Sequence, residues 1–208
     1  MRELPALLDR LEDAGGQPDA VPSTDGWELI LAENIGYLVD DQRRWRALGQ
    51  LRAVVGLEPG QILTAPDDVL QGIVVGPRPA ERARRLRRCA ELAIAGASWR
   101  AYPGIGKPGA DRIDLFSGSR AVLALDANCM RVLARLGYAD PRSSYARSYA
   151  RAQAAAATQL DGTVPALQRA HQLLRRHGQL ICRRKDPACD SCPIADDCPS
   201  AGRPPPLY

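Results

Sequence analysis

The sequence predicts an all-α fold. Apolar residues recur at intervals of three and four along most of the chain, which is the spacing that gives a helix one apolar face. No alternation of apolar and polar residues continues beyond about five residues, the usual strand length being ~5–6. Residues 122–125 form a short apolar run that is too brief to define a sheet. Aromatic residues make up 5% of the chain, so aliphatic side chains must fill the core.

The first half of the chain contains five helical patterns separated by glycine and proline. These patterns cover residues 4–11, a segment from Trp27, residues 45–55, a segment starting within 65–68, and residues 80–95. Glycines at positions 15, 16 and 56 end two of them. Acidic residues follow Pro66 immediately, and acids favour the first turn of a helix. Residues 76–79 are rich in glycine and proline and predict a loop.

The second half continues in the same way. A glycine-rich turn is followed by a helix to about Phe116, and another helix follows Asp126. Two more helices are predicted within residues 144–159 and 164–177.

The charge pattern is compatible with a polyanionic partner. The net charge is +4, and the isoelectric point is about 8.8. Lysine occurs only at Lys107 and Lys185, so nearly all basic side chains are arginines, whose planar fork suits phosphate. The abundance of Arg with Ala, Gly and Pro also fits a GC-rich genome. No apolar run approaches the ~18–20 residues of a membrane span. The N-terminus lacks the apolar stretch of a signal peptide, so we expect a cytoplasmic protein, nucleoid-associated if bacterial.

Four of the six cysteines lie close together near the C-terminus. Their pattern is Cys182-x6-Cys189-x2-Cys192-x5-Cys198. Four thiolates on a compact loop can hold a [4Fe–4S] cluster or one tetrahedral zinc ion. A zinc ribbon usually has two Cys-x2-Cys arms, so this spacing favours the cluster over zinc or two disulfides. Cys89 and Cys129 stand alone and are expected to be buried free thiols.

Two further features suggest contact with DNA or chemistry on it. Gly104, Ile105, Gly106 and Lys107 lie between two predicted helices. Such a turn, with the N-terminus of the next helix, can hold a phosphate without reading base sequence. It is also an ordinary helix-to-helix turn. Asp126 precedes a predicted helix, where Asp most often caps the helix, but a carboxylate there can also stabilise a cationic sugar or orient a water molecule.

The order of these features resembles the helix-hairpin-helix DNA glycosylase superfamily. The chain looks like the iron–sulfur branch of this superfamily, which contains endonuclease III and the adenine glycosylase. The turn comes first, Asp126 follows Gly106 by 20 residues, and the cysteines come last. Residues 125–135 look like the adenine-glycosylase version of their segment, and residues 177–182 look like the family's approach to the cluster. The resemblance runs from about Trp27 to Cys198.

This resemblance implies a fold, a cofactor and an activity. It implies two helical lobes with a DNA groove between them: a six-helix-barrel-like domain with the hairpin at residues 23–121, and a cluster domain at residues 1–22 and 122–208. The four cysteines would bind a [4Fe–4S] cluster. Asp126 would support hydrolysis of the N-glycosidic bond of a damaged or mismatched base in base-excision repair. We expect a monomer that acts on double-stranded DNA with the damaged base flipped out.

One position departs from the bifunctional members of this family. Those members carry a Lys at the position that follows Lys107. That Lys attacks the sugar and cleaves the strand through a Schiff base. This chain has Pro108 instead. Lys107 does not replace the missing nucleophile, because a shift of one residue turns a helical side chain by ~100°. We therefore expect a monofunctional glycosylase, with AP-lyase activity absent or weak.

The resemblance assigns contacts to further residues. Glu33 is similar to a Glu that faces the base pocket of adenine and thymine glycosylases, although the residues alone slightly favour a solvated or capping role. Asn34 and Tyr37 would line that pocket. Arg78 lies where the family inserts a wedge into DNA. The basic residues expected to face phosphate from the cysteine loop are Arg183, Arg184 and Lys185.

Two alternative functions are compatible with the same fold. The first is a DNA-binding or damage-sensing protein that has lost catalysis. The second is a redox sensor bound to DNA, which would use the cluster as its switch.

Overall fold

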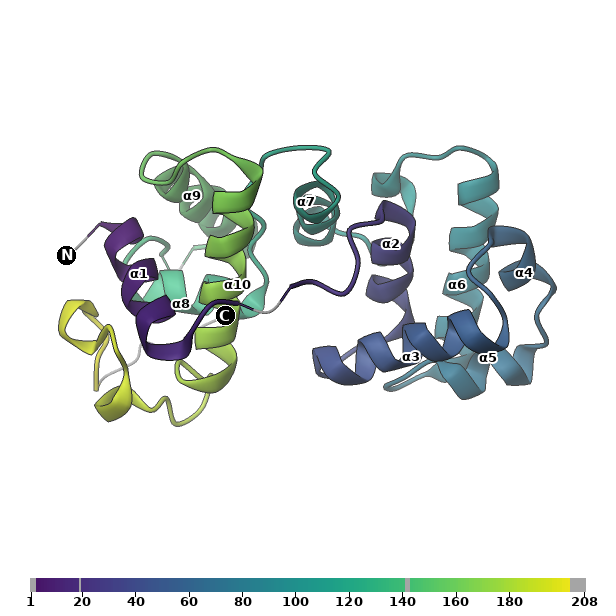
Figure 1. The fold of residues 1–208 in the computed structure, drawn as a ribbon, viewed down its shortest axis with the longest axis horizontal. Helices are drawn as coiled ribbons and strands as arrows, with labels where there is room; N and C mark the ends of the chain where they lie inside the picture. The colour runs from purple at the N-terminus through teal and green to yellow at the C-terminus, as the bar shows by residue number, and fades with distance from the viewer. Residues whose placement is uncertain (1–2, 19, 141–142, 203–208) are drawn as a thin grey trace. The chain divides into compact units, whose positions relative to one another are not determined.

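The computed structural model describes residues 3–18, 20–140 and 143–202. Every regular element in this part of the chain is a helix, so the predicted all-α class is confirmed (Figure 1). Residues 122–125 lie in an irregular connection. A single isolated β-bridge joins Gly36 to Val75 among the described residues. None of the described helices is both long and apolar enough to cross a membrane.

The described residues form two compact units. The hairpin unit is Val21–Ser117, and the cysteine unit combines Met1–Ala20 with Gly118–Tyr208. The domain limits of 22/23 and 121/122 that the resemblance implies stay a prediction.

The hairpin unit contains six α-helices and one 3₁₀ helix among its described residues. In order they are α2 (Gly26–Ile35), α3 (Asp41–Val54), α4 (Pro59–Thr64), α5 (Asp67–Ile73), α6 (Pro79–Ile94), η1 (Trp99–Ala101) and α7 (Lys107–Phe116). Asp25 and Asp40 start α2 and α3 by accepting hydrogen bonds from backbone N–H groups of the first turns. The short helix α4 has no counterpart in the apolar pattern of the sequence, because only Ile62 of its residues is buried.

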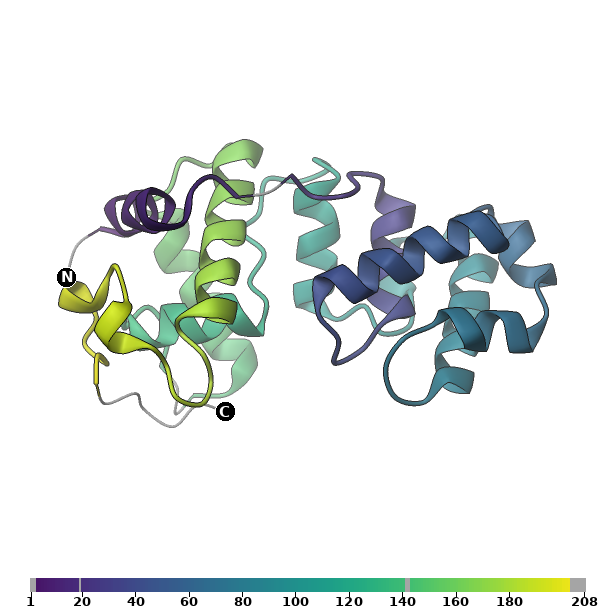
Figure 2. The same ribbon diagram turned by 60° about the horizontal axis from the view of Figure 1, so that its bottom comes forward.

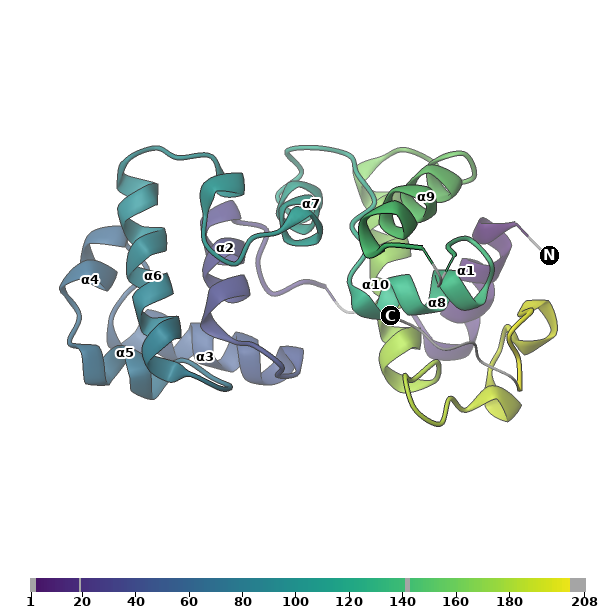
Figure 3. The ribbon, with the colours of Figure 1, turned by 180° about the vertical axis from the view of Figure 1, so that it is seen from behind.

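Helix α6 is the central element of the hairpin unit. It lies between α2 and α4 (Figures 1 and 3) and also packs against α5. Its inner face carries Ala83, Leu86 and Ala90, while most of its arginines lie outside this face. The main core around it also includes Leu31, Ile35, Leu51, Ile62 and Leu70.

The cysteine unit contains four α-helices and two short 3₁₀ helices in its described part. These are α1 (Leu4–Gly15), α8 (Ala127–Arg135), α9 (Tyr145–Ala157), α10 (Val164–Leu180), η2 (Cys189–Ser191) and η3 (Ala195–Asp197). Helix α10 packs against both α1 and α8, and α8 also packs against α9. The C-terminal segment with the two 3₁₀ helices, yellow in Figure 2, follows the end of α10.

Candidate functional site

The two-glycine turn in the hairpin unit leads directly into α7. Gly104 has a positive φ of 74°, a left-handed conformation that glycine adopts without steric cost. Ile105 is buried, and its N–H donates to the carbonyl of Tyr102 at 3.3 Å. The Ile105 side chain therefore anchors the turn, and a DNA contact at this position must come from the backbone. Gly106 is the N-cap residue of α7, whose N-terminal dipole favours an anion.

Lys107 and Pro108 are the first two residues of α7. Pro108 fits this place because its fixed φ suits a helix start and its missing N–H has no partner there in any case. The Nζ atom of Lys107 lies 2.7 Å from Oδ2 of Asp111, one turn along the helix. Asp111 is almost completely buried, whereas the Lys107 side chain is largely exposed. The only lysine near the turn is thus held in an ion pair within its own helix.

Glu33 and Asn34 lie on α2 beside this turn. Glu33 forms an ion pair with Arg112 of α7, and the two side chains are 20% and 14% exposed. Asn34 is buried, and its Nδ2 donates to the Ile30 carbonyl at 3.1 Å. Its Oδ1 has no hydrogen-bond partner among the described residues. A Cβ at position 104 would come within 3.0 Å of that oxygen, so glycine at this place lets the turn approach α2 closely.

Tyr37 and Arg78 lie apart from that contact, at the loop before α6. Tyr37 follows α2 and is exposed, and its N–H donates to the Val75 carbonyl at 3.3 Å. The guanidinium of Arg82 lies 5.0 Å from the centre of the Tyr37 ring, which is a cation–π distance. Arg78 is 80% exposed and has a positive φ of 59°. The structure brings Glu33 and Asn34 to the hairpin turn and places Tyr37 beside the predicted wedge loop.

Asp126 is the N-cap residue of α8 in the cysteine unit. Its Oδ1 accepts the backbone N–H groups of Asn128 and Cys129, each at 2.8 Å. Its Oδ2 is 3.3 Å from Nδ2 of Asn128 and forms an ion pair with Arg175 of α10. The capping role that the residues alone predicted is thus observed. It leaves open a second role, because 21% of the Asp126 side chain is exposed.

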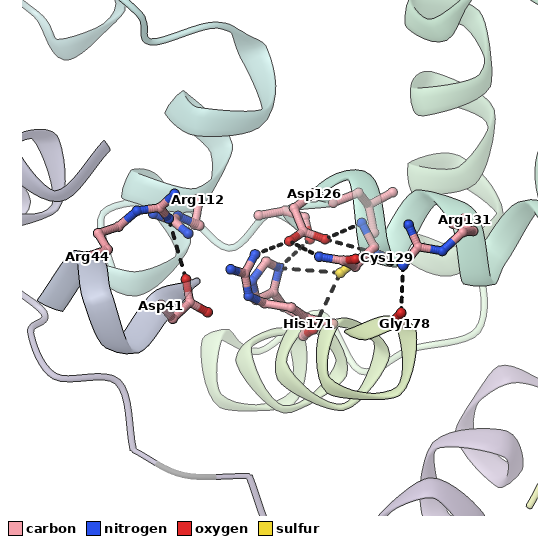
Figure 4. A network of polar contacts seen from close by, with 12 residues as sticks. Asp41, Arg44, Arg112, Asp126, Cys129, Arg131, His171 and Gly178 are labelled. Atoms are coloured by element: carbon pink, nitrogen blue, oxygen red, sulfur yellow. Dashed lines mark hydrogen bonds and ion pairs between the residues drawn. The ribbon is translucent and has the colours of Figure 1, made fainter. Parts of the chain in front are cut away.

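The surroundings of Asp126 keep its carboxyl group ionised. Burial would raise its pKa, but the positive charge of Arg175, the nearby His171 and the Cys129 N–H outweigh burial and lower the pKa to about 2. His171 is buried, with Nδ1 2.8 Å from the Ala124 carbonyl. Figure 4 shows His171 and Cys129 beside Asp126. Asp126 is therefore an anion at any physiological pH.

A hydrogen-bonded chain leads from Asp126 to the cysteine loop. Arg131 donates from Nη2 to Oδ1 of Asn128 and to the Gly178 carbonyl, both at 2.6 Å (Figure 4). Its Nε donates to the Cys182 carbonyl at 2.7 Å. Helices α8 and α10 come this close because residue 178 is glycine, where a Cβ would lie 2.8 Å from Asn128.

The four C-terminal cysteines line one cavity, together with apolar residues of α8 and of the loop. All four are free thiols, so the two-disulfide alternative is not what the structure contains. No three His, Cys, Asp or Glu side chains of the described residues are gathered closely enough to hold one metal ion. Cys89 and Cys129 are buried free thiols, as predicted, and burial raises the pKa of Cys89 to about 12.

Arg135 supplies positive charge to this cavity. It is buried, and its Nη1 donates to Sγ of Cys182 at 3.2 Å and to the Arg183 carbonyl at 2.8 Å. Its buried Nε has no hydrogen-bond partner in the described part of the chain. A buried cation with an unused donor fits an anionic group better than a neutral apolar filling. The donor set therefore fits four thiolates around a negatively charged iron–sulfur cluster.

The basic residues of the cysteine loop are exposed. These are Arg183, Arg184 and Lys185. Their exposure is compatible with the predicted phosphate contact, which stays a prediction.

Arg112, Arg135 and Arg175 have no role that a sequence motif reveals. Arg135 could have been noticed, because its spacing of four from Arg131 places both on one face of a helix. Arg112 and Arg175 have no such signal, since each meets its carboxylate on a different helix.

Comparison with known proteins identifies the fold. No model of a known protein family matches the chain. The "Putative DNA repair glycosylase" of Methanocaldococcus jannaschii is 24% identical over 214 residues, which is 90% of this chain and 92% of the relative.

Three similar solved structures cover nearly the whole chain. Endonuclease III in a trapped covalent DNA intermediate has a TM-score of 0.78 at 18% identity, with 95% of each chain covered. A non-covalent endonuclease III–DNA complex has a TM-score of 0.77 at 19% identity, with 97% of each covered. A thermostable thymine-DNA glycosylase has a TM-score of 0.76 at 17% identity, covering 94% of this chain and 93% of the other. The predicted endonuclease III-like fold is confirmed.

Proposed function

We propose that this protein is a DNA glycosylase of base-excision repair, which hydrolyses the N-glycosidic bond of a damaged or mismatched base. The observation that carries the proposal is Asp126, an ionised and partly exposed carboxylate fixed at the N-terminus of α8. This carboxylate occurs in a chain with the fold of endonuclease III and of a thymine-DNA glycosylase.

The proposed reaction uses Asp126 as an electrostatic group. Departure of the base leaves an oxocarbenium-like sugar, and a fixed carboxylate stabilises its positive charge and helps to orient the attacking water. The two backbone hydrogen bonds to Oδ1 hold the group in place before the substrate binds. Little reorganisation is therefore needed during the reaction.

The hairpin unit would hold the DNA. Backbone groups of Gly104, Ile105 and Gly106, with the N-terminal end of α7, would bind a phosphate without reading base sequence. We assign Glu33, Asn34 and Tyr37 to recognition of the flipped base, and Arg78 to the gap that the base leaves. Extrusion of the base costs a few kcal/mol and is least costly for a damaged or mismatched base.

We propose that the enzyme is monofunctional. Pro108 has no nucleophile, and the amine of Lys107 is paired with Asp111 at 2.7 Å. Strand cleavage through a Schiff base needs an unprotonated amine at the sugar, which this arrangement does not supply.

We further propose that Cys182, Cys189, Cys192 and Cys198 hold a [4Fe–4S] cluster. When bound, the cluster would fix the loop that carries Arg183, Arg184 and Lys185. Arg135 would neutralise part of the negative charge of the cluster through its bond to Cys182. The chain of contacts through Arg131 then links a rigid cysteine loop to the start of α8.

A second candidate function is DNA binding without catalysis. The ion pair between Asp126 and Arg175 favours it, because the carboxylate already has a cationic partner.

A panel of duplexes, each with one damaged or mismatched base, separates the two functions. We expect the wild-type protein to release one class of base under single-turnover conditions and to leave an abasic site that breaks only after treatment with alkali. Asp126→Asn, which keeps the helix cap, should lower the rate about 100- to 1,000-fold. No release from any duplex, or an unchanged rate in the variant, would favour the non-catalytic function.

A further inference from the structure

The Asp126 carboxylate does not need its contact with Arg175 to be held in position. Oδ1 of Asp126 is already held by two backbone N–H groups at 2.8 Å, and these bonds form as soon as α8 folds. The side chains of Asp126 and Arg175 are 21% and 16% exposed. The pair therefore stands at the edge of solvent, where another anion can reach the guanidinium.

Arg175 differs from its neighbours on α10 in what it contacts. Arg169 pairs with Asp9 and Glu12 of α1. Arg176 donates to the carbonyls of Gly16 and Gln17 just after α1. Those two arginines connect α10 to the N-terminal segment, whereas Arg175 is directed toward the carboxylate at the start of α8.

The pairing also opposes the chemistry of Asp126. A guanidinium against the carboxylate cancels much of the field that would stabilise a cationic sugar, and it adds repulsion toward that sugar. A DNA phosphate competes well for the same guanidinium, because phosphate accepts the same bidentate hydrogen bonds. Because the pair is partly exposed, a phosphate can replace the carboxylate without leaving the guanidinium unpaired.

We propose that Arg175 is a DNA-phosphate contact that the free protein holds against Asp126. Binding of a duplex moves the guanidinium from the carboxylate to a phosphate and leaves the negative charge of Asp126 directed at the sugar. The proposal rests on the proposed function only for the use of that charge. The exchange of partners itself requires only that the protein bind DNA.

A double-mutant cycle in binding affinity tests the exchange without any excision. The probe is a duplex that contains one tetrahydrofuran abasic-site analogue, which has no base to release. Asp126→Asn keeps the cap and removes the competing charge, so it should tighten binding about fivefold. In the Arg175→Gln background the same change should have no effect. Arg175→Gln alone should reduce the steepness of log affinity against log salt by about 0.9, the value for one phosphate.

Arg176→Gln is the matched control, because it removes the same charge from the next residue of the helix. Asp126→Asn should still tighten binding about fivefold in that background. Equal tightening with and without Arg175, or no tightening at all, would overturn the proposal. A duplex that the wild-type protein does not bind would overturn the proposal and the proposed function together. If the affinities behave as expected but the protein releases no base from any lesion, only the catalytic function would be overturned.

Discussion

Glu33 and Asp126 are both carboxylates paired with an arginine from another helix, but they stand at opposite ends of their own helices. Asp126 precedes α8, where the helix dipole and two backbone N–H groups favour its charge. Glu33 is the third residue from the C-terminal end of α2, where the helix dipole disfavours a negative charge. Asp126 is therefore positioned by local structure, whereas Glu33 depends on Arg112.

The largest difference between Asp126 and Glu33 should be in their effect on the rate of base release. We expect Asp126→Asn to lower the single-turnover rate about 100- to 1,000-fold, since it removes the charge that we propose to stabilise the sugar. Glu33→Gln should cost about tenfold, the lower end for a group that orients or protonates the base. The measurement is the single-turnover rate of base release for both variants on the same substrate duplex. A larger loss for Glu33→Gln would reverse the assignment.

The next difference should be in stability. Arg112→Gln leaves Glu33 without its cation at the unfavourable end of α2, and we expect a loss of about 2 kcal/mol in the free energy of unfolding. Arg175→Gln should cost less, between about 1 and 2 kcal/mol, because two backbone N–H groups still stabilise the Asp126 carboxylate. Urea unfolding of each variant measures both values. The double variant with Glu33→Gln should recover most of the loss at Arg112, and failure to do so would assign Arg112 another role.

Acid should distinguish Asp126 in a third way. Its pKa is lowered from 3.8 to about 2, so the ionised form stabilises the folded state above pH ~4, and this contribution is lost as the pH falls toward ~2. A shift of nearly two pH units corresponds to about 2.5 kcal/mol at ~1.4 kcal/mol per unit. Unfolding free energies of the wild-type protein and Asp126→Asn should differ in slope only within this range. Parallel curves would show that the pair contributes no pH-dependent stability.

The smallest effect is expected at Lys107, the first residue of α7. Lys107→Gln should change base release by about twofold at most, because the proposed phosphate contact of this exposed side chain would contribute little. Borohydride treatment on abasic DNA should trap no adduct with either protein, since Pro108 has no side-chain nucleophile. Strong trapping that disappears in Lys107→Gln would show that this lysine is the nucleophile of a bifunctional enzyme.

Helix order and the motif positions could be predicted from the sequence, because both depend on local spacing. The apolar stripes, the breaking glycines and the Asp at the start of α8 were visible without coordinates, and each matches an observed element. The short helix α4 was missed, since a helix that buries one apolar residue leaves no periodic pattern.

The partners of the candidate site were decided by the tertiary structure alone. Arg112 meets Glu33, Arg175 meets Asp126, and Arg135 meets Cys182, each across two segments that are distant in the sequence. An arginine on a helix carries no sequence signal of the carboxylate or thiol it will face. The sequence therefore determined which groups could act, and packing of α7, α8 and α10 within their units decided which of their charges are already paired.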